Sequence, residues 1–328
     1  MGGDMTALGQ PIGPEQEALY EQLARKALVT FGLESADLLC LSSRQNVVFR
    51  VQTERGRWAI RICPPEQDRK ALMRELLWLV ALNLDTDLGV PEPVLTPTGE
   101  LYQTVSMRGL SGFHAFSLFR WVKGQFADTI TGDHLRALGR LTATLHRHAQ
   151  TFDWPEEYAA DRWWLGGLEE RIRSLRRAFR EPGERVETVL RALPLVHKSL
   201  STLGHGRDAV GPVHGDLDFH HVLFHEGSAR AIDFKTVHWN YYGLDIAASL
   251  RSIRLQSEAG ELLRAYTEGY TGVRPLPCDL DAHLPTLEAL HAMLQLDRVL
   301  AAPAARSEEM QDALQWAAGR AGGLLSAK

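Results

Sequence analysis

Four side chains able to take part in metal-assisted chemistry gather in one stretch of the chain, residues 213–247. His214, Asp216 and His221 follow closely on one another, and Asp233 comes after a short apolar run. Carboxylates favour hard divalent cations, whereas imidazole groups bind softer metals or carry protons. If these groups meet in space, they can hold a metal ion beside a catalytic carboxylate.

A β-hairpin is predicted between the two aspartates. Residues 222–224 and 231–232 are apolar enough for two short strands, and Gly227 lies in the polar turn that joins them. A hairpin of this length returns the chain to its starting point, so the carboxylates of Asp216 and Asp233 should face one site. Two such carboxylates need a cation between them or a raised pKa on one of them. The first functional hypothesis is therefore a metal-assisted transfer reaction.

The overall composition is that of a globular protein whose main partner is not nucleic acid. The chain has 328 residues, of which 45% are hydrophobic and 23% charged, and its net charge is −5. A chain of this length can bury a full core as one large domain or two lobes. Nucleic-acid binding usually needs a concentrated basic surface, and no apolar run reaches the roughly 20 residues that cross a bilayer. We therefore expect neither a nucleic-acid partner nor a membrane span.

The cysteines indicate a reducing compartment. Cys40, Cys63 and Cys278 lie far apart, and their odd number favours reduced thiols over a disulfide framework or a zinc site. No signal-peptide pattern opens the chain. These features predict a cytoplasmic protein.

The first third of the chain predicts a small antiparallel sheet with two helices. An amphipathic helix is expected at residues 14–31, and three strands follow at 38–41, 47–51 and 58–62. Polar or glycine-containing turns separate the strands. A second helix is expected at residues 66–83, where leucines recur at helical spacing.

A buried ion pair is predicted between that second helix and the last strand of the meander. Glu75 falls on the apolar stripe of the helix, where an unpaired carboxylate would be costly. Arg61 on the neighbouring strand is well placed to pair with it. A Glu75 that edges the stripe and reaches solvent is the alternative.

The character of the sequence changes near residue 124. A strand is expected at 116–122, and beyond Gly124 strands give way mainly to helices. We therefore predict an amino-terminal lobe at residues 1–122 and a carboxy-terminal lobe at 123–328, with a hinge at about 119–124. The expected helices of the second lobe are residues 133–148, 163–179, 184–203, 245–257, 260–269, 284–302 and about 308–325.

Several motifs together resemble the aminoglycoside phosphotransferase family, which includes choline kinases, homoserine kinases and a stress-response Ser/Thr kinase. His214-Gly215-Asp216 and Ile232-Asp233-Phe234 carry the resemblance. Weaker matches occur in the right order from residue 38 to 256, at Ala59-Ile60-Arg61, Glu75, residues 119–124, residues 138–146 and residues 243–247. The order makes the signal strong where each motif alone is weak.

The resemblance implies an α+β, bilobal, protein-kinase-like fold with a small antiparallel β-sheet lobe, one helix within it, and a larger, mostly helical lobe. It implies an ATP-dependent phosphotransferase with Mg²⁺, or else Mn²⁺, as the metal cofactor. Phosphoryl transfer depends on positioning and charge neutralisation. By resemblance, Asp216 is the catalytic base, Asp233 a metal ligand, and Arg61, anchored by Glu75, the phosphate-binding cation.

Other positions match the family in supporting roles. His214 is expected to hold the backbone of the catalytic loop, and Asp245 to buttress it or to cap its own helix. The resemblance places the edge of the adenine against the backbone of Arg120, Trp121 and Val122. Packing near the adenine would come from Ile60 and Val105.

The chain departs from the family pattern at three places. The second metal ligand, usually Asn, is His221, and imidazole favours ions softer than Mg²⁺. The usual phosphate-binding Lys is Arg61, whose permanent charge and forked donors make it an acceptable substitute. The first turn of the sheet lacks the glycines that close on phosphates, and Ser43 and Asn46 are expected to replace them in part.

The many histidines also suggest an independent zinc site. They are His220, His221, His225 and His238. No thiol is nearby, and adjacent histidines on a strand point to opposite faces. The zinc site is therefore the weaker interpretation.

Three functions fit the sequence. The first is a kinase that phosphorylates a hydroxyl group of a small molecule. The second is a Ser/Thr protein kinase of the stress-response type. The third is a nucleotide-binding regulatory module without catalysis, which the histidine at position 221 and the glycine-poor turn favour.

The acceptor is not specified by the sequence. Acidic residues at 156, 157 and 161 and the aromatic side chains that surround them could line its pocket and would suit a cationic acceptor. The aromatic candidates are Trp163, Trp164, Trp239, Tyr241 and Tyr242. The expected partners are thus a nucleotide and a small-molecule acceptor, and the oligomeric state is not indicated.

Overall fold

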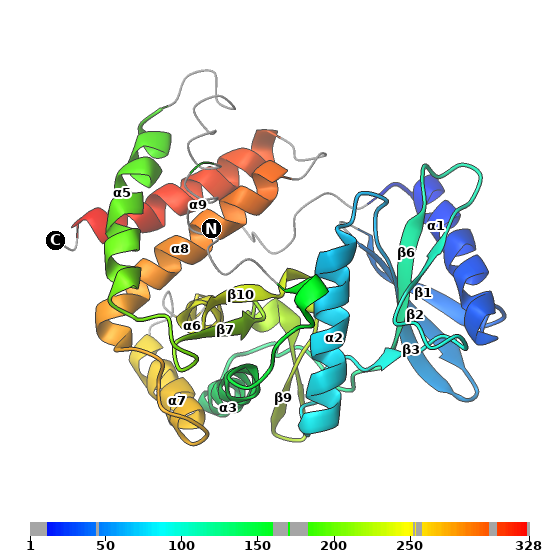
Figure 1. Ribbon diagram of the computed structural model, residues 1–328, viewed down its shortest axis with the longest axis horizontal. Coiled ribbons are helices and arrows are strands. Elements are labelled where there is room, and N and C mark those ends of the chain that lie inside the picture. Colours follow the sequence, from blue (N-terminus) through cyan, green and yellow to red (C-terminus); the bar gives the residue numbers. More distant parts are fainter. Residues whose placement is uncertain are drawn as a thin grey trace. The chain divides into compact units, whose positions relative to one another are not determined.

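The computed structural model describes residues 12–43, 46–159, 170, 183–251, 253, 258–301 and 307–326 (Figure 1). These residues form two compact units, of which the first ends at Lys123 and the second begins at Gly124. The amino-terminal unit contains an antiparallel sheet, and the carboxy-terminal unit is mostly helical. This confirms the predicted α+β class.

The sheet of the amino-terminal unit has the strand order β1-β2-β3-β6-β4, and β5 pairs with β6. Every pairing is antiparallel. The first three strands form the predicted meander, with longer strands than expected. The bounds are β1 Asp37–Ser43, β2 Val47–Thr53, β3 Gly56–Ile62, β4 Pro93–Val94, β5 Gln103–Val105 and β6 His114–Arg120.

Two helices accompany this sheet. Helix α1, Pro14–Leu28, runs into a 3-10 turn at Val29–Phe31, as the pattern predicted. Helix α2, Arg69–Asp85, begins three residues later than predicted because the Asp68 carboxylate accepts a hydrogen bond from the backbone N–H of Lys70 at 2.9 Å. An acceptor at this position satisfies one of the unpaired N–H groups of the first turn and so sets where the helix starts. Buried side chains of α1 and of strands β2, β3 and β6 form the core.

The carboxy-terminal unit is built from helices whose ends lie within four residues of the predicted ones where the structure describes them, except that α6 ends at Leu250 and not near residue 257. They are α3 Gly132–Ala149, α5 Glu184–Ser201, α6 Gly243–Leu250, α7 Ala259–Thr271, α8 Leu280–Ala301 and α9 Ser307–Ser326. The helix predicted at residues 163–179 falls outside the described residues. In the part of the chain that is described, no helix is long and apolar enough to cross a membrane.

Helices α3 and α7 pack with their backbones in contact. A Cβ atom on Gly139 would overlap the carbonyl oxygen of Tyr266, and one on Gly269 would overlap that of Arg136. The two glycines therefore set the distance between the helices. This contact holds α7 against the face of α3 that carries His146.

Short strands flank the loop that carries the predicted catalytic residue Asp216. Strands β8 (Val222–His225) and β9 (Ser228–Ala231) form the predicted hairpin. A second antiparallel pair, β7 (Val210–Val213) with β10 (His238–Tyr241), was not predicted. This pair lies at the start and the end of the stretch, so it closes the segment into a loop whose two ends are held together.

The aromatic residues proposed for the acceptor pocket have other roles where they are described. Trp239, Tyr241 and Tyr242 are all buried, and the hydroxyl of Tyr241 donates to the carbonyl of Leu200. The prediction that they line an open pocket is wrong, because Trp239 and Tyr241 on strand β10 and Tyr242 at the start of α6 all lie in the core. Glu156 and Glu157 lie on an exposed 3-10 turn. Residue 161, Trp163 and Trp164 fall outside the described residues.

Candidate active site

The catalytic loop follows β7 and carries Asp216 on a backbone held by Asp245. The backbone N–H groups of His214 and Gly215 donate to the two carboxylate oxygens of Asp245, at 2.8 and 2.7 Å. Asp245 lies inside α6, and the N-cap of that helix is Tyr242, so Asp245 is not the helix cap that the sequence allowed. Burial opposes the charge of Asp245, yet the hydrogen bonds from His146 and from the backbone N–H of Gly215 keep its pKa below the usual range.

His146 supports Asp245 from helix α3. Its ring contacts the Tyr270 hydroxyl through Nδ1 at 2.8 Å and the Asp245 carboxylate through Nε2 at 3.3 Å. Burial is the largest effect on His146 and lowers its pKa. His146 is a neutral side chain that donates to Asp245 and accepts from Tyr270.

His214 ties the catalytic loop to the end of the hairpin. Its Nε2 donates to the carbonyl of Ile232 at 3.0 Å, and its Nδ1 accepts from the backbone N–H of Asp216 at 3.3 Å. Burial lowers the pKa of this imidazole. With both ring nitrogens on backbone atoms, His214 orients the loop.

Residues that follow the hairpin form hydrogen bonds with the backbone of the loop that carries Asp216 and with one another. The Thr236 hydroxyl donates to the carbonyl of His214 at 2.7 Å, and the Thr236 carbonyl accepts from Nδ1 of His238 at 2.7 Å. Burial lowers the pKa of His238 to about 4, so its other nitrogen can accept from the Asn240 amide. Gly215 has a φ of 80°, and a Cβ there would lie 2.7 Å from the carbonyl oxygen of Thr236, so only glycine fits.

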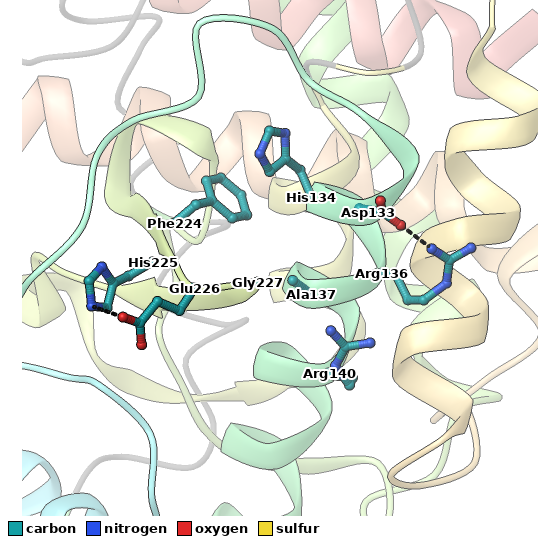
Figure 2. A pocket seen from close by; sticks show the side chains of 9 residues that line it. All are labelled: Asp133, His134, Arg136, Ala137, Arg140, Phe224, His225, Glu226 and Gly227. Atoms are coloured by element: carbon teal, nitrogen blue, oxygen red, sulfur yellow. Dashed lines mark hydrogen bonds and ion pairs between the residues drawn. The ribbon is translucent and has the colours of Figure 1, made fainter.

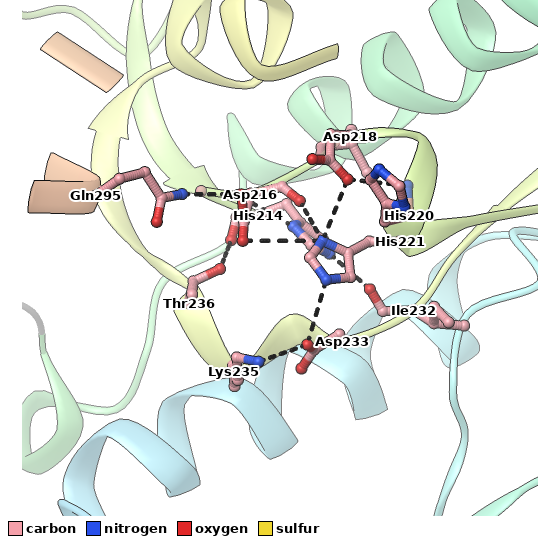
Figure 3. A network of polar contacts seen from close by, with 12 residues as sticks. His214, Asp216, Asp218, His220, His221, Ile232, Asp233, Lys235, Thr236 and Gln295 are labelled. Atoms are coloured by element: carbon pink, nitrogen blue, oxygen red, sulfur yellow. Dashed lines mark hydrogen bonds and ion pairs between the residues drawn. The ribbon is translucent and has the colours of Figure 1, made fainter. Parts of the chain in front are cut away.

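Asp216 itself is held by helix α8, which the sequence did not connect with the site. The side-chain amide of Gln295 donates to Oδ1 of Asp216 at 2.9 Å (Figure 3). Nε2 of His291 lies 3.8 Å from the same oxygen. Arg298 donates to the carbonyl of Gly215 at 3.2 Å. Burial raises the pKa of Asp216, but the contact with His291 and the charge of Arg298 outweigh it and hold that pKa below the usual range. Asp216 is therefore an ionised carboxylate at neutral pH.

The hairpin brings Asp233 to the same histidine that touches the catalytic loop. Nδ1 of His221 contacts the carbonyl oxygen of Asp216 at 2.8 Å, and Nε2 lies 3.5 Å from Oδ2 of Asp233. The carbonyl oxygen can only accept, so Nδ1 carries the hydrogen; in the neutral imidazole, Nε2 then has its lone pair toward Asp233. The carboxylates of Asp216 and Asp233 thus face one site, as predicted, and each lies near a ring nitrogen of His221 (Figure 3).

Asp233 is in a conformation that few residues adopt. Its φ and ψ are 63° and 59°, the left-handed region, where a residue with a side chain is uncommon. Oδ2 of Asp233 forms an ion pair with Nζ of Lys235 at 2.7 Å. No role for Lys235 was predicted from the sequence. In the part of the chain that is described, no group of three His, Cys, Asp or Glu side chains could hold a metal ion.

In the amino-terminal unit, the predicted ion pair is present. Arg61 donates to Glu75 through both terminal nitrogens, with Nη1–Oε1 at 2.6 Å and Nη2–Oε2 at 2.9 Å, and both side chains are buried. The guanidinium carbon lies 5.1 Å from the centre of the Phe119 ring. A two-pronged pair stacked on an aromatic ring holds Arg61 in one orientation.

The other residues predicted to contact the nucleotide differ in their burial and in their backbone hydrogen bonds. Ser43 is buried at the end of β1, Asn46 is half-buried just before β2, and Ile60 lies in the core of the unit. The backbone N–H groups of Arg120 and Trp121 already donate, to the carbonyls of Glu92 and Arg57. The backbone of Arg120 and Trp121, which was expected to bind the adenine, therefore has its N–H groups bonded within the protein. The backbone of Val122 is the third group of that expectation and stays a prediction.

Val105, the other residue expected to pack near the adenine, lies in the core of the unit as Ile60 does. It is buried at the end of β5.

A hollow of about 520 Å³ lies elsewhere in the carboxy-terminal unit (Figure 2). It is lined by the first turns of α3 and by the turn of the β8–β9 hairpin, including Arg136, Arg140, Phe224 and Glu226. None of the predicted catalytic, metal-binding or nucleotide-binding residues lines it. The Phe224 ring is in contact with the His134 ring, at 4.4 Å between centres.

The residues that the sequence analysis missed follow a pattern that the sequence does contain. His291, Gln295 and Arg298 stand four and then three positions apart, so they share one face of α8. The helix is otherwise rich in apolar residues, and a polar stripe on such a helix is a signal of a buried polar contact. The pattern alone does not indicate which distant loop these side chains contact.

Comparison with known proteins agrees with this arrangement. The sequence pattern described as the phosphotransferase enzyme family matches residues 40–276. No curated protein matches the sequence.

Solved structures with the same fold include several kinases. A microcompartment-associated aminopropanol kinase is 25% identical, with a TM-score of 0.75, over 93% of this chain and 98% of its own. An amicoumacin kinase in complex with AMP-PNP and Ca²⁺ is 17% identical, with a TM-score of 0.73, over 94% of this chain and 96% of its own. A choline kinase from Cryptosporidium parvum is 13% identical, with a TM-score of 0.57, over 94% of each chain.

Proposed function

Because the chain belongs to the phosphotransferase enzyme family and has its protein-kinase-like fold, we propose that it is an ATP-dependent kinase that phosphorylates a hydroxyl group of a small molecule. One observation carries the proposal. Asp216 is an ionised carboxylate whose position is set by Gln295 and whose loop is held by Asp245.

The proposed reaction uses Asp216 as the base. One carboxylate oxygen, Oδ1, is held by Gln295, and the other, Oδ2, orients the acceptor hydroxyl. As the acceptor oxygen bonds to the γ-phosphorus, the bond from that phosphorus to the ADP oxygen breaks and the hydroxyl proton passes to Oδ2. The products are ADP and a phosphate monoester. A carboxylate of low pKa suits a reaction in which the base mainly positions the nucleophile.

Asp233 and His221 are the proposed metal ligands. The donor atoms fit a divalent cation because the Asp233 carboxylate and the lone pair on Nε2 of His221 face each other at 3.5 Å. The hydrogen bond from Nδ1 to the Asp216 carbonyl keeps His221 in the tautomer that a metal requires. When bound, the metal ion would neutralise charge on the nucleotide phosphates. An imidazole ligand favours Mn²⁺ over Mg²⁺ more than an amide does.

The amino-terminal unit is proposed to bind the nucleotide. Arg61, held in one orientation by Glu75, would contact the phosphates with its permanent positive charge. Ser43 and Asn46 would be further donors. Val122 would contact the adenine. Arg120 and Trp121 would contribute through their carbonyls.

The class of acceptor we propose is an amino alcohol. It is supported by the aminopropanol kinase, which is similar to this chain over nearly the whole length of both. The described acidic residues Glu156 and Glu157 are exposed, so they give no independent support for a cationic acceptor.

The test is phosphoryl transfer from ATP, with Mg²⁺ or Mn²⁺, to a panel of amino alcohols, amino sugars, choline and other alcohols. We expect transfer to an amino alcohol, and we expect Asp216→Asn to lower kcat on the order of 10²–10⁴-fold while AMP-PNP binding is kept. Asp312→Asn on the exposed face of α9 is the matched control and should leave kcat unchanged.

Other outcomes would select the alternatives. Labelling of proteins in a lysate without transfer to any small molecule would indicate a Ser/Thr protein kinase. Binding of AMP-PNP without transfer to any acceptor, with either metal, would indicate a regulatory nucleotide-binding module. Activity that survives in Asp216→Asn would contradict the assignment of the base.

A further inference from the structure

Lys235 places a fixed positive charge on the proposed metal ligand. Its Nζ lies 2.7 Å from Oδ2 of Asp233, and 30% of the lysine side chain and 26% of the aspartate side chain are exposed. An ion pair on an open surface would be screened by water and would contribute little. This one is half-buried and lies beside the catalytic loop (Figure 3).

The position of Lys235 is set by an anchored turn. Residues Phe234–Thr236 form a 3-10 turn directly after Asp233. Phe234 is fully buried and packs edge-on against the His214 ring, with 4.6 Å between the ring centres. The Thr236 side chain bonds to the loop backbone. Both neighbours of Lys235 are thus held in place, and this fixes where the lysine side chain starts.

The same carboxylate oxygen therefore has two neighbours of different kinds. His221 approaches Oδ2 of Asp233 at 3.5 Å and Lys235 approaches it at 2.7 Å. In protein kinases, two Mg²⁺ ions lie at this point, held by an aspartate and an asparagine. Here the aspartate is shared by an imidazole and an ammonium group. An ammonium group repels a divalent cation that tries to bind the same carboxylate.

We infer that Lys235 supplies, as part of the chain, the charge that a second divalent cation supplies in protein kinases, so that the nucleotide is bound with a single divalent ion. The inference rests on the proposed function. The single ion is the one assigned to Asp233 and His221. The ammonium group offers one positive charge and three donors for phosphate oxygens, and it is present whether or not the metal is bound.

Two consequences of opposite sign follow for a variant that lacks this charge. Without metal, the Asp233 carboxylate is no longer paired with Lys235 and repels the nucleotide phosphates, so Lys235→Gln should bind AMP-PNP more weakly than the wild type. With metal, the variant lacks the ammonium charge that opposes a second cation beside the ion at Asp233 and His221, so the variant should bind a second ion. A lysine with a purely structural role would change neither the number of ions nor the metal dependence of nucleotide binding.

The experiment counts bound Mn²⁺ by electron paramagnetic resonance, with the full chain and saturating AMP-PNP. We expect one Mn²⁺ per chain for the wild type and two for Lys235→Gln. Calorimetry in EDTA should show AMP-PNP affinity lowered about tenfold in the variant, the effect of one lost charge contact. Lys198→Gln, a charge removed from the exposed face of α5, is the matched control and should behave as the wild type.

The outcomes separate this inference from the function on which it rests. Two Mn²⁺ ions in the wild type, or equal ion counts in the wild type and Lys235→Gln, would overturn the role of Lys235 and leave the proposed kinase intact. If AMP-PNP causes no Mn²⁺ binding by either protein, the nucleotide site itself is wrong and both proposals fall. Thermal unfolding of Lys235→Gln shows whether the variant is folded in each case.

Discussion

The two units hold their important charges in contrasting ways. In the amino-terminal unit, Arg61 and Glu75 pair through two hydrogen bonds, and one strand and one helix are enough to bring them together. In the carboxy-terminal unit, Asp216 depends on α6 through the backbone of the two residues before it and on α8 through its side chain. A buried pair of two partners mainly affects stability, whereas an aspartate held from several elements has the fixed orientation and lowered pKa that its proposed role as the base requires.

The largest expected effect tests the amino-terminal half of this comparison. Glu75→Gln leaves the buried Arg61 with half of its partner, so we expect a loss of about 3–5 kcal/mol in the free energy of unfolding. The measurement is urea-induced unfolding followed separately for the two units.

Arg120 and Glu92 provide the control for that experiment. They form an ion pair at 3.1 Å, but their side chains are 63% and 49% exposed. Glu92→Gln should therefore cost no more than about 1 kcal/mol. Equal losses for Glu75→Gln and Glu92→Gln would mean that the buried pair is not the main support of its unit.

The next effect tests whether α8 orients the base. Gln295→Met keeps the volume of the side chain and removes the donor to Asp216, so kcat should fall roughly ten- to a hundredfold, as expected for a misplaced reacting group. The KM for ATP should stay the same, because the proposed nucleotide contacts are made by other residues. A variant that melts at the wild-type temperature and keeps full kcat would show that Gln295 does not position Asp216.

The smallest effect is a shift in pH dependence. The charge of Arg298 helps to hold the pKa of Asp216 low, so Arg298→Met should move the acidic limb of the kcat/KM profile up by about one pH unit or more. Arg264→Met, which removes an exposed arginine of α7, is the control. An acidic limb that stays in place would separate Arg298 from the ionisation of Asp216.

The lowered pKa of Asp216 also predicts how the stability of the fold responds to acid. A carboxylate whose pKa is lower in the folded protein than in the unfolded chain stabilises the fold above the unfolded value of about 3.9. This stabilisation is lost as the pH falls through the lower folded value. Because Asp216 and Asp245 both have lowered pKa values, the free energy of unfolding should fall as the pH drops below this unfolded value, and urea-induced unfolding across that pH range measures it.

Local patterns in the sequence were good predictors of local structure. The meander, the β8–β9 hairpin and the Arg61–Glu75 pair were all predicted, because each depends on residues close in sequence or on neighbouring elements. The start of α2 was placed too early, since the pattern of leucines does not reveal that Asp68 caps the helix.

The pairing of β7 with β10 was missed for a physical reason. Val210–Val213 contains glycine and proline, and His238–Tyr241 is polar and aromatic, so neither segment has the alternation of a typical strand. Their pairing depends on the loop that they enclose. The aromatic residues of β10 were assigned to a pocket because their burial depends on this same pairing.

The sequence by itself determined the family, the fold class and the short segment in which two aspartates and a histidine meet. Those features follow from residue types at short spacing, and a hairpin needs few residues to return the chain. Only the tertiary structure showed that Gln295 on α8 reaches Asp216, that His146 is a neutral support, and that Lys235 occupies the Asp233 carboxylate. Such contacts depend on how helices pack and on the direction of individual side chains, and neither is encoded in spacing along the chain.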